Sequence, residues 1–230
     1  MQDQTRQRLD RLATLIAESP HNLVSARDRE LVATHHIPEC VAVCTQLKPG
    51  AHTHWIDLGT GGGLPGLVCA IMFPLVGWTL IDATAKKIDA VNGFIDDLEL
   101  ENARGVVGRA EHLARDTDYR GVYDGVISRA VARLDVVTEL ARGFVHPGGQ
   151  IVVIKGPGLV QERGYMQRCA GQLKVHEKGT VILGPSDRQS HVITIIADGP
   201  VPEMIPRKDG VPASKPLGGP RTVYSPKERS

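Results

Sequence analysis

The 230-residue chain has few aromatic residues and no excess of charge of either sign. Aromatic residues make up 4% of the sequence, which argues against a platform that stacks the bases of single-stranded nucleic acid. The chain has 27 basic and 26 acidic residues, so its total charge neither supports nor excludes a nucleic-acid partner. Residues 201–230 differ, because six basic residues there outnumber three acidic ones. Any basic surface should therefore come from this segment.

Long hydrophobic runs and paired cysteines are also missing. No apolar run approaches the roughly 20 residues that span a bilayer, and the charged N-terminus lacks the apolar region of a signal peptide. The four cysteines form no CxxC pair, and no further ligands nearby complete a zinc site. We therefore expect free thiols, no metal, no membrane contact, a cytoplasmic location and a monomer.

The first 48 residues are predicted to be a helical extension. Leu9, Leu12, Leu15 and Ile16 recur at helical spacing, and Ser19-Pro20 ends the run. A second helix is predicted from about residue 28 to residue 47, where Lys48-Pro49-Gly50 stops it.

From residue 49 to residue 200 short apolar runs alternate with helical patterns, as in a parallel sheet buried on both faces. Seven strands are predicted, at residues 54–59, 78–83, 103–108, 123–130, 150–156, 179–183 and 191–197. The loop 184–190 is too short for a crossover helix, so the last two strands should form an antiparallel hairpin. The prediction is an α/β, Rossmann-like fold with a mostly parallel seven-stranded sheet: an N-terminal extension (1–48), this core (49–200) and a basic C-terminal segment (201–230).

The sharpest motif is a glycine-rich loop between the first strand and the following helix. Five glycines fall within residues 59–66. Glycine is required where the backbone takes a positive φ or where a ligand approaches it closely, and the free amides of the next helix favour an electronegative group. A tight turn that binds no ligand is the alternative interpretation.

Two acids accompany this loop. Asp57 precedes it, and Asp82 ends the next strand, where an acid meets the ribose hydroxyls of an adenosine-containing ligand. The carboxylate of Asp57 would repel a pyrophosphate but suits the ammonium group of S-adenosylmethionine. S-adenosylmethionine is therefore favoured over a dinucleotide. The predicted donor-binding residues in this region are Asp57, Gly59, Gly61, Gly63, Leu64 and Asp82.

The third strand leads into a block that adds to this site. Gly108 to His112 follow it, where the adenine edge of the donor would lie, and we assign Ala110 and Glu111 to that edge. The alternative is a helix N-terminus at which Glu111 complements the helix dipole.

Several separated blocks between residues 22 and 217 resemble one family. They are similar to the bacterial 16S ribosomal RNA (guanine-N7) methyltransferases, also called the glucose-inhibited division protein B family. The blocks are Asn22-Leu23-x-Ser25-x-Arg27, His36-Ile37, Asp57 to Gly66 with its Leu-Pro-Gly ending, Asp82 with Lys87, Arg109-Ala110-Glu111, Ser128-Arg129-Ala130, Lys155-Gly156, Pro206-Arg207-Lys208-x-Gly210-x-Pro212 and Lys215-Pro216-Leu217. One block departs: Pro38-Glu39-Cys40 stands where the family commonly has Asp-Ser after its His-Ile.

The resemblance implies a class I S-adenosylmethionine-dependent methyltransferase that acts on a guanine in the decoding-centre (530) loop of 16S ribosomal RNA. The partner would be that RNA or the small ribosomal subunit. Arg129 ends the fourth strand and could clamp the donor carboxylate or the guanine; an ion pair with Asp57 or Asp124 is the alternative. The predicted catalytic residues are Asn22, Arg129 and Arg207, and the predicted RNA contacts are Arg27, His36, Lys155, Arg207 and Lys208.

Methylation of guanine N7 needs no general base, because that atom carries a lone pair and no proton. The sequence accordingly has no Asn-Pro-Pro-aromatic motif of amino-methylating enzymes and no cysteine at the end of the fourth or fifth strand. Other readings stay open at this point: a methyltransferase acting on a small molecule or protein, an NAD-dependent oxidoreductase, and an assembly factor that binds the donor without turnover.

Overall fold

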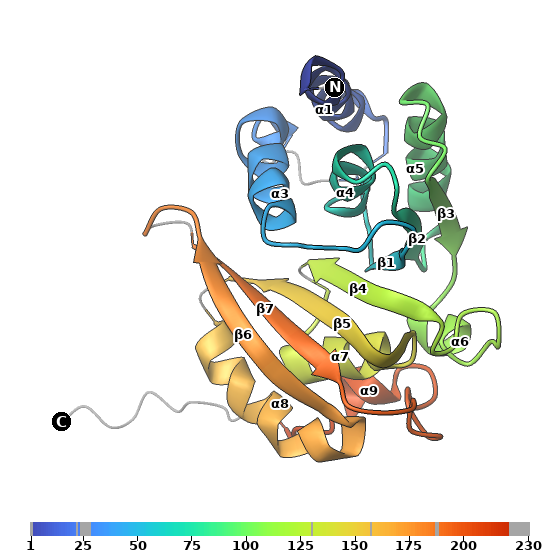
Figure 1. Cartoon of the computed structure of the whole chain (residues 1–230), viewed down its shortest axis with the longest axis vertical. Helices are drawn as coiled ribbons and strands as arrows, with labels where there is room; N and C mark the ends of the chain where they lie inside the picture. The colour runs from blue at the N-terminus through green and yellow to red at the C-terminus, as the bar shows by residue number, and fades with distance from the viewer. Residues whose placement is uncertain are drawn as a thin grey trace.

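The computed structural model describes residues 2–21, 23, 29–129, 131–156, 158–186 and 189–220. Seven strands form one sheet in the order β3-β2-β1-β4-β5-β7-β6, with helices on both of its faces (Figure 1). The strands are β1 (His54–Leu58), β2 (Gly77–Asp82), β3 (Ala103–Val107), β4 (Tyr123–Arg129), β5 (Val145–Lys155), β6 (Val175–Leu183) and β7 (Ser190–Ala197). The seven predicted strands are thus confirmed.

The strand directions also agree with the prediction. Strands β1 to β5 run parallel to one another, and β7 pairs antiparallel with both β5 and β6. Strands β5 and β6 begin earlier than predicted, at Val145 and Val175. The extra residues of β6 include an irregularity between Glu177 and Gly179, and such a bulge hides the strand from a simple alternation pattern.

The helices pack in two layers (Figure 1). Helices α1, α3, α4 and α5 cover one face of the sheet, and α7 and α8 cover the other. Their bounds are α1 (Gln2–Glu18), α3 (Ile37–Cys44), α4 (Gly66–Met72), α5 (Ala85–Asp97), α6 (Ala110–Leu113), α7 (Leu134–Arg142), α8 (Leu159–Leu173) and α9 (Val211–Ser214). A π-helix, η1 (Val32–His36), precedes α3 within the predicted second helix.

Strand β5 shows why a continuous apolar run forms a buried strand here. Ile151 and Val153 point into the core under α7 and α8, whereas Val152 and Ile154 point into the core under α1, α3 and α4. Successive side chains of a strand point to opposite faces of the sheet. All four are buried because helices cover both faces. Apolar residues on both faces therefore signal a central strand.

The N-terminal helices share one core with the rest of the fold. Leu12 and Ile16 of α1 and Cys40 and Cys44 of α3 pack in the same cluster as Cys69 of α4. The sulfur atoms of Cys44 and Cys69 lie 3.1 Å apart, and all four cysteines are free and buried. The N-terminal helices are therefore part of the same folded unit as the sheet.

The strand order reverses between β1 and β4. In a doubly wound sheet the crossover connections diverge there, and a crevice opens at the carboxyl ends of the two strands. The glycine-rich loop follows β1 and Arg129 ends β4, so both lie at this point of the sheet.

Candidate active site

The glycine-rich loop turns sharply between β1 and α4. Gly59, Gly61 and Gly63 take positive φ values of 72°, 57° and 92°, which glycine adopts without strain. A Cβ atom on Gly63 would lie 2.4 Å from the side chain of Leu67, whereas a Cβ atom on Gly61 would have nothing within 4 Å. Gly63 is therefore required by packing. Gly61 lies beside open space that a ligand can enter.

Asp57, at the end of β1, holds this loop by hydrogen bonds. Its Oδ2 accepts hydrogen bonds from the hydroxyl of Thr60 at 2.6 Å and from the amide of Gly66 at 2.9 Å. Burial raises the pKa of Asp57 to about 6, although both hydrogen bonds act in the opposite direction. Its buried Oδ1 has no hydrogen-bond partner among the described residues. One oxygen thus shapes the loop, and the other is an acceptor without a donor.

Asp82 stands at the end of β2 beside the loop. Its Oδ2 accepts a hydrogen bond from the amide of Gly61 at 3.1 Å, and its Oδ1 accepts one from the amide of Thr84 at 2.9 Å. Lys87 lies 3.9 Å from the same carboxylate. These contacts fix the carboxylate at the edge of the crevice, where part of it stays exposed.

The block after β3 is tied to the C-terminal segment. The carboxylate of Glu111 accepts a hydrogen bond from the amide of Gly210 at 3.1 Å, and its side chain is 8% exposed. Arg109 and His112 both contact Asp209, at 3.3 and 2.9 Å. The carboxylate of Glu111 therefore holds the C-terminal segment in this structure. Neighbouring Ala110 is half-buried at the start of α6.

Arg129 pairs with a residue that the sequence analysis did not select. Its Nη1 donates a hydrogen bond to Oε2 of Glu39 at 2.9 Å, and the other carboxylate oxygen of Glu39 accepts one from the hydroxyl of Ser190. The expected alternative partners were Asp57 and Asp124, but neither forms this pair. The replaced family block at Pro38-Glu39-Cys40 was the only signal in the sequence that pointed to Glu39.

The remaining described residues of the prediction lie at the end of β5 (Lys155), in the glycine-rich loop (Leu64) and at the end of η1 (His36). Lys155 donates to the carbonyl oxygen of Ala132 at 2.6 Å and lies 2.8 Å from Glu162. Leu64 is buried in the core, so only its backbone can face a ligand, and His36 is half-buried. Two further predicted residues, Asn22 and Arg27, lie outside the described residues.

The two basic residues of the C-terminal segment have different surroundings. The guanidinium of Arg207 is held by the buried carboxylate of Glu139, at 2.9 and 2.7 Å, and its side chain is 23% exposed. Lys208 is exposed. Arg207 is therefore a fixed part of the fold, and Lys208 is the residue of the two that is open to a partner.

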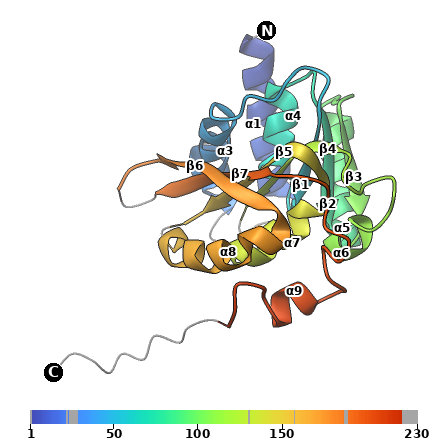
Figure 2. The same ribbon diagram turned by 60° about the horizontal axis from the view of Figure 1, so that its bottom comes forward.

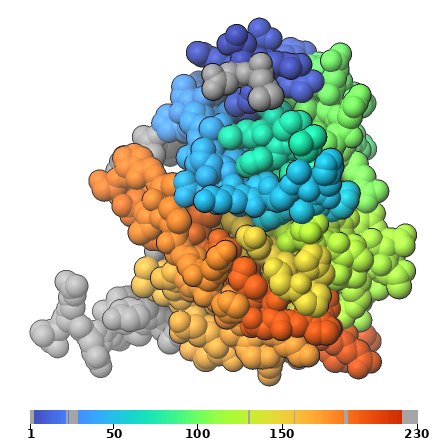
Figure 3. Space-filling view, viewed as in Figure 1, coloured from blue at the N-terminus to red at the C-terminus, as the bar shows by residue number. Residues whose placement is uncertain are grey.

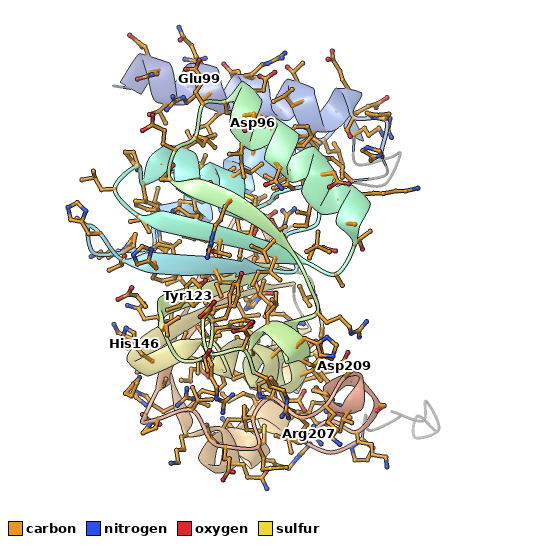
Figure 4. All side chains as sticks on the ribbon, turned by 90° about the vertical axis from the view of Figure 1, so that its right-hand side faces the viewer. Asp96, Glu99, Tyr123, His146, Arg207 and Asp209 are labelled. Atoms are coloured by element: carbon orange, nitrogen blue, oxygen red, sulfur yellow. The ribbon has the colours of Figure 1, made fainter. Side chains whose placement is uncertain are left out.

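The C-terminal segment is clamped to the protein by side chains. Figure 2 shows α9 and the chain leading to it below α7 and α8, and Figure 4 shows Arg207 and Asp209 at that end of the molecule. Arginines donate to its backbone carbonyls: Arg115 to Pro206, Arg120 to Ile205 and Pro202, Arg133 to Gly219, and Arg168 to Gly218. Asp135 accepts a hydrogen bond from the amide of Gly218. Between Pro202 and Gly219 the backbone of the segment is thus held by side chains of the core.

Comparison with known sequences identifies the family of this chain. Residues 5–190 match the family model of rRNA small subunit methyltransferase G. The chain belongs to this family. The ribosomal RNA small subunit methyltransferase G of Deinococcus deserti is 36% identical over 91% of this chain and 88% of its own, and that of Thermotoga sp. (strain RQ2) is 32% identical over 92% and 91%. The predicted family resemblance is confirmed.

Solved structures of methyltransferases show the same fold. A geranyl diphosphate methyltransferase in complex with SAM superposes with a TM-score of 0.58, at 14% identity, over 80% of this chain and 94% of its own. The 16S rRNA (adenine(1408)-N(1))-methyltransferase of Catenulisporales acidiphilia superposes with a TM-score of 0.54, at 17% identity, over 71% and 92%. The predicted class I methyltransferase fold is confirmed.

Members of the rRNA small subunit methyltransferase G family are methyltransferases, and the cofactor of this chain is S-adenosylmethionine. Its site fits the group. The carboxylate of Asp82 can accept from ribose hydroxyls, and the open side of Gly61 leaves room for the ligand. The ammonium contact predicted for Asp57 is not open to a ligand, because its side chain is fully buried; Asp57 instead shapes the loop.

None of the described helices is long and apolar enough to cross a membrane. Within the described ranges, no group of three or more His, Cys, Asp or Glu side chains could hold a metal ion.

Proposed function

We propose that this enzyme methylates N7 of a guanine in the decoding-centre (530) loop of 16S ribosomal RNA by direct in-line transfer. The observation that carries the proposal is the donor site built from the glycine-rich loop, Asp57 and Asp82 in a member of this family. The names of the relatives support ribosomal RNA as the substrate class. The guanine and its loop come from the family resemblance.

The residues of the chain bind and orient the donor. When bound, S-adenosylmethionine supplies a methyl group carried on a positively charged sulfur. Asp57 holds the glycine-rich loop that surrounds the donor, and Asp82 holds the ribose. Because both carboxylates are fixed by backbone amides, little side-chain freedom is lost when the donor binds.

No residue of the chain has to remove a proton in this reaction. Guanine N7 carries a lone pair and no hydrogen, so the protein contributes mainly by positioning the two reactants, an effect that can reach roughly 7–11 kcal/mol. Positive charge moves from sulfur to the guanine ring during transfer. The carboxylates near the crevice suit a cation in both states.

The acceptor side is formed by basic residues at the carboxyl edge of the sheet. A guanine must be splayed out of its RNA loop to present N7, which favours loop over paired RNA. Arg129 lies at this edge, Lys208 is open to phosphates, and Arg207 holds the segment that carries Lys208. Lys155 and His36 complete the proposed RNA-facing set. The enzyme would act as a cytoplasmic monomer on 16S ribosomal RNA or the small subunit.

Nucleoside analysis tests the reaction. The enzyme is incubated with S-adenosylmethionine labelled in its methyl group and with small-subunit RNA from cells that lack the activity, and the RNA is digested to nucleosides. We expect the label in 7-methylguanosine alone. Label in another nucleoside, or in protein, would overturn the guanine N7 assignment. Donor binding without any transfer would instead indicate an assembly factor.

A further inference from the structure

A cavity of about 460 Å³ lies beside the crevice, between the N-terminal helices and the β6–β7 hairpin. Helix α3 contacts β6, and Figures 1 and 3 show the hairpin next to the N-terminal helices. The apolar lining of the cavity comes from both elements: Leu31 and Ala42 from the N-terminal helical region, and Leu183 and Pro185 from the hairpin. This volume and lining suit a flat aromatic base.

Among the described residues that line this cavity, Glu39 is the one with a carboxylate. Arg129 donates to its Oε2 at 2.9 Å and Ser190 donates to its Oε1, and the Glu39 side chain is still 30% exposed. An ionised carboxylate has about four lone-pair positions. Two are used by these partners, so each oxygen can accept one further hydrogen bond from a molecule in the cavity.

The position of the cavity relates it to the donor site. Arg129 joins Glu39 to the end of β4, and Val131, two residues further, packs against Gly59 of the glycine-rich loop, where a Cβ atom would lie 2.5 Å from its side chain. Glu39 at the cavity is thus linked to the donor loop through Arg129 and Val131.

We propose that Glu39 recognises the target guanine through its N1–H and N2–H groups, an inference that rests on the proposed function. Guanine presents these two donors on its Watson–Crick edge, whereas the acceptor N7 lies on a different edge of the base. Two adjacent donors match the two oxygens of a carboxylate. Binding by Glu39 leaves N7 facing away, toward the donor. Adenine has a lone pair at N1 and no amino group at C2, so it would leave both oxygens of Glu39 without a donor.

The test compares guanine with inosine, which lacks the N2 amino group. Small-subunit RNA is assembled by splinted ligation with either base at the methylated position, and kcat/KM is measured for wild type and Glu39→Gln. Loss of a hydrogen bond to a charged group predicts that wild type prefers guanine by about tenfold or more. In Glu39→Gln we expect that preference to fall to within about threefold, with lower activity on guanine.

Glu177→Gln is the matched control. Glu177 also pairs with an arginine and a hydroxyl, Arg163 and Thr180, but it lies near the other end of β6, about 20 Å from Leu183 at a rise of about 3.3 Å per residue. We expect this variant to keep the activity and the guanine preference of wild type.

Two results would overturn the proposal while leaving the proposed function intact. One is a wild-type enzyme that methylates guanine and inosine equally well, a measurement that needs no variant. The other is a Glu39→Gln enzyme that loses activity on both bases by the same factor, because Glu39 would then only position Arg129. Failure of wild type to methylate guanine N7 at all would contradict the proposed function itself.

Discussion

Arg207 donates two hydrogen bonds from its guanidinium to the carboxylate of Glu139, and its backbone amide donates a third at 3.0 Å. Glu139 is fully buried on α7, and the two residues are 68 positions apart. The side-chain pairing raises the pKa of Arg207 above its usual value. The pair therefore fastens the C-terminal segment to the core by a buried carboxylate that has no contact with water.

Removing the charge of Glu139 should destabilise the protein. Glu139→Gln leaves the guanidinium without its counter-charge, and we expect the free energy of unfolding to fall by about 2–3 kcal/mol. This is less than the roughly 3–5 kcal/mol typical of a fully buried pair, because Arg207 keeps partial access to water. Urea unfolding measures the loss in the free energy of unfolding. The control is Glu203→Gln, on the exposed part of the same segment. An equal loss in both variants would contradict the account.

Alanine variants of Arg207 and Lys208 should distinguish an effect on stability from an effect on RNA binding. Arg207→Ala removes the clamp, so we expect lower turnover on RNA together with lower stability. Lys208→Ala removes only an exposed charge, so turnover on RNA should fall while the free energy of unfolding stays within about 0.5 kcal/mol. Calorimetry should show the donor affinity of both variants close to wild type. Loss of donor affinity with normal RNA turnover would reverse these assignments.

Substitution of Gly61 should lower the affinity for the donor far more than it lowers the stability of the fold. A methyl group at Gly61 meets no protein atom, so Gly61→Ala bears only the cost of a left-handed backbone, about 1–2 kcal/mol. The same methyl enters the space of the ligand, and we expect at least a tenfold loss of donor affinity. Gly148→Ala is the matched control, since Gly148 has a φ of 83° and no atom within 4 Å of its Cβ position. Equal donor affinities of the two variants would contradict the placement of the donor beside Gly61.

Much of this fold follows from local patterns, whereas the pairs that complete the site do not. The seven strands and the glycine-rich loop were predictable because alternation and glycine density act within a few residues. The pairing of Arg129 with Glu39 joins residues 90 positions apart, and that of Arg207 with Glu139 joins residues 68 apart. Their partners are set by how helices pack on the sheet. A single sequence therefore indicates the charged residues without indicating what they contact.

Asp57 should give stability a distinctive pH dependence. Its pKa rises from 3.8 to about 6 by burial, so between these values the folded chain binds a proton that the unfolded chain has released. The contribution of Asp57 to the free energy of unfolding is therefore highest below about pH 4 and falls as pH rises toward 6. The difference corresponds to about 3 kcal/mol.

The variant Asp57→Asn cannot titrate and isolates this effect. Between about pH 4 and pH 7 we expect the free energy of unfolding of Asp57→Asn to improve relative to wild type by about 2–3 kcal/mol, as measured by denaturant unfolding at both values. Other titrating groups are common to the two proteins and cancel in this difference. Parallel pH profiles would show that Asp57 does not titrate in this range.

The central claim is that one guanine N7 in the decoding-centre loop receives the methyl group. It is tested most directly by treating unmethylated small-subunit RNA with the enzyme and S-adenosylmethionine, followed by reduction and aniline cleavage, which cuts the chain at N7-methylguanine. Primer extension then maps the cut. We predict a single new cleavage in the 530 loop, absent without the donor. Cleavage at a different guanine would contradict the proposed target, and methylated RNA that aniline does not cut would contradict methylation at N7.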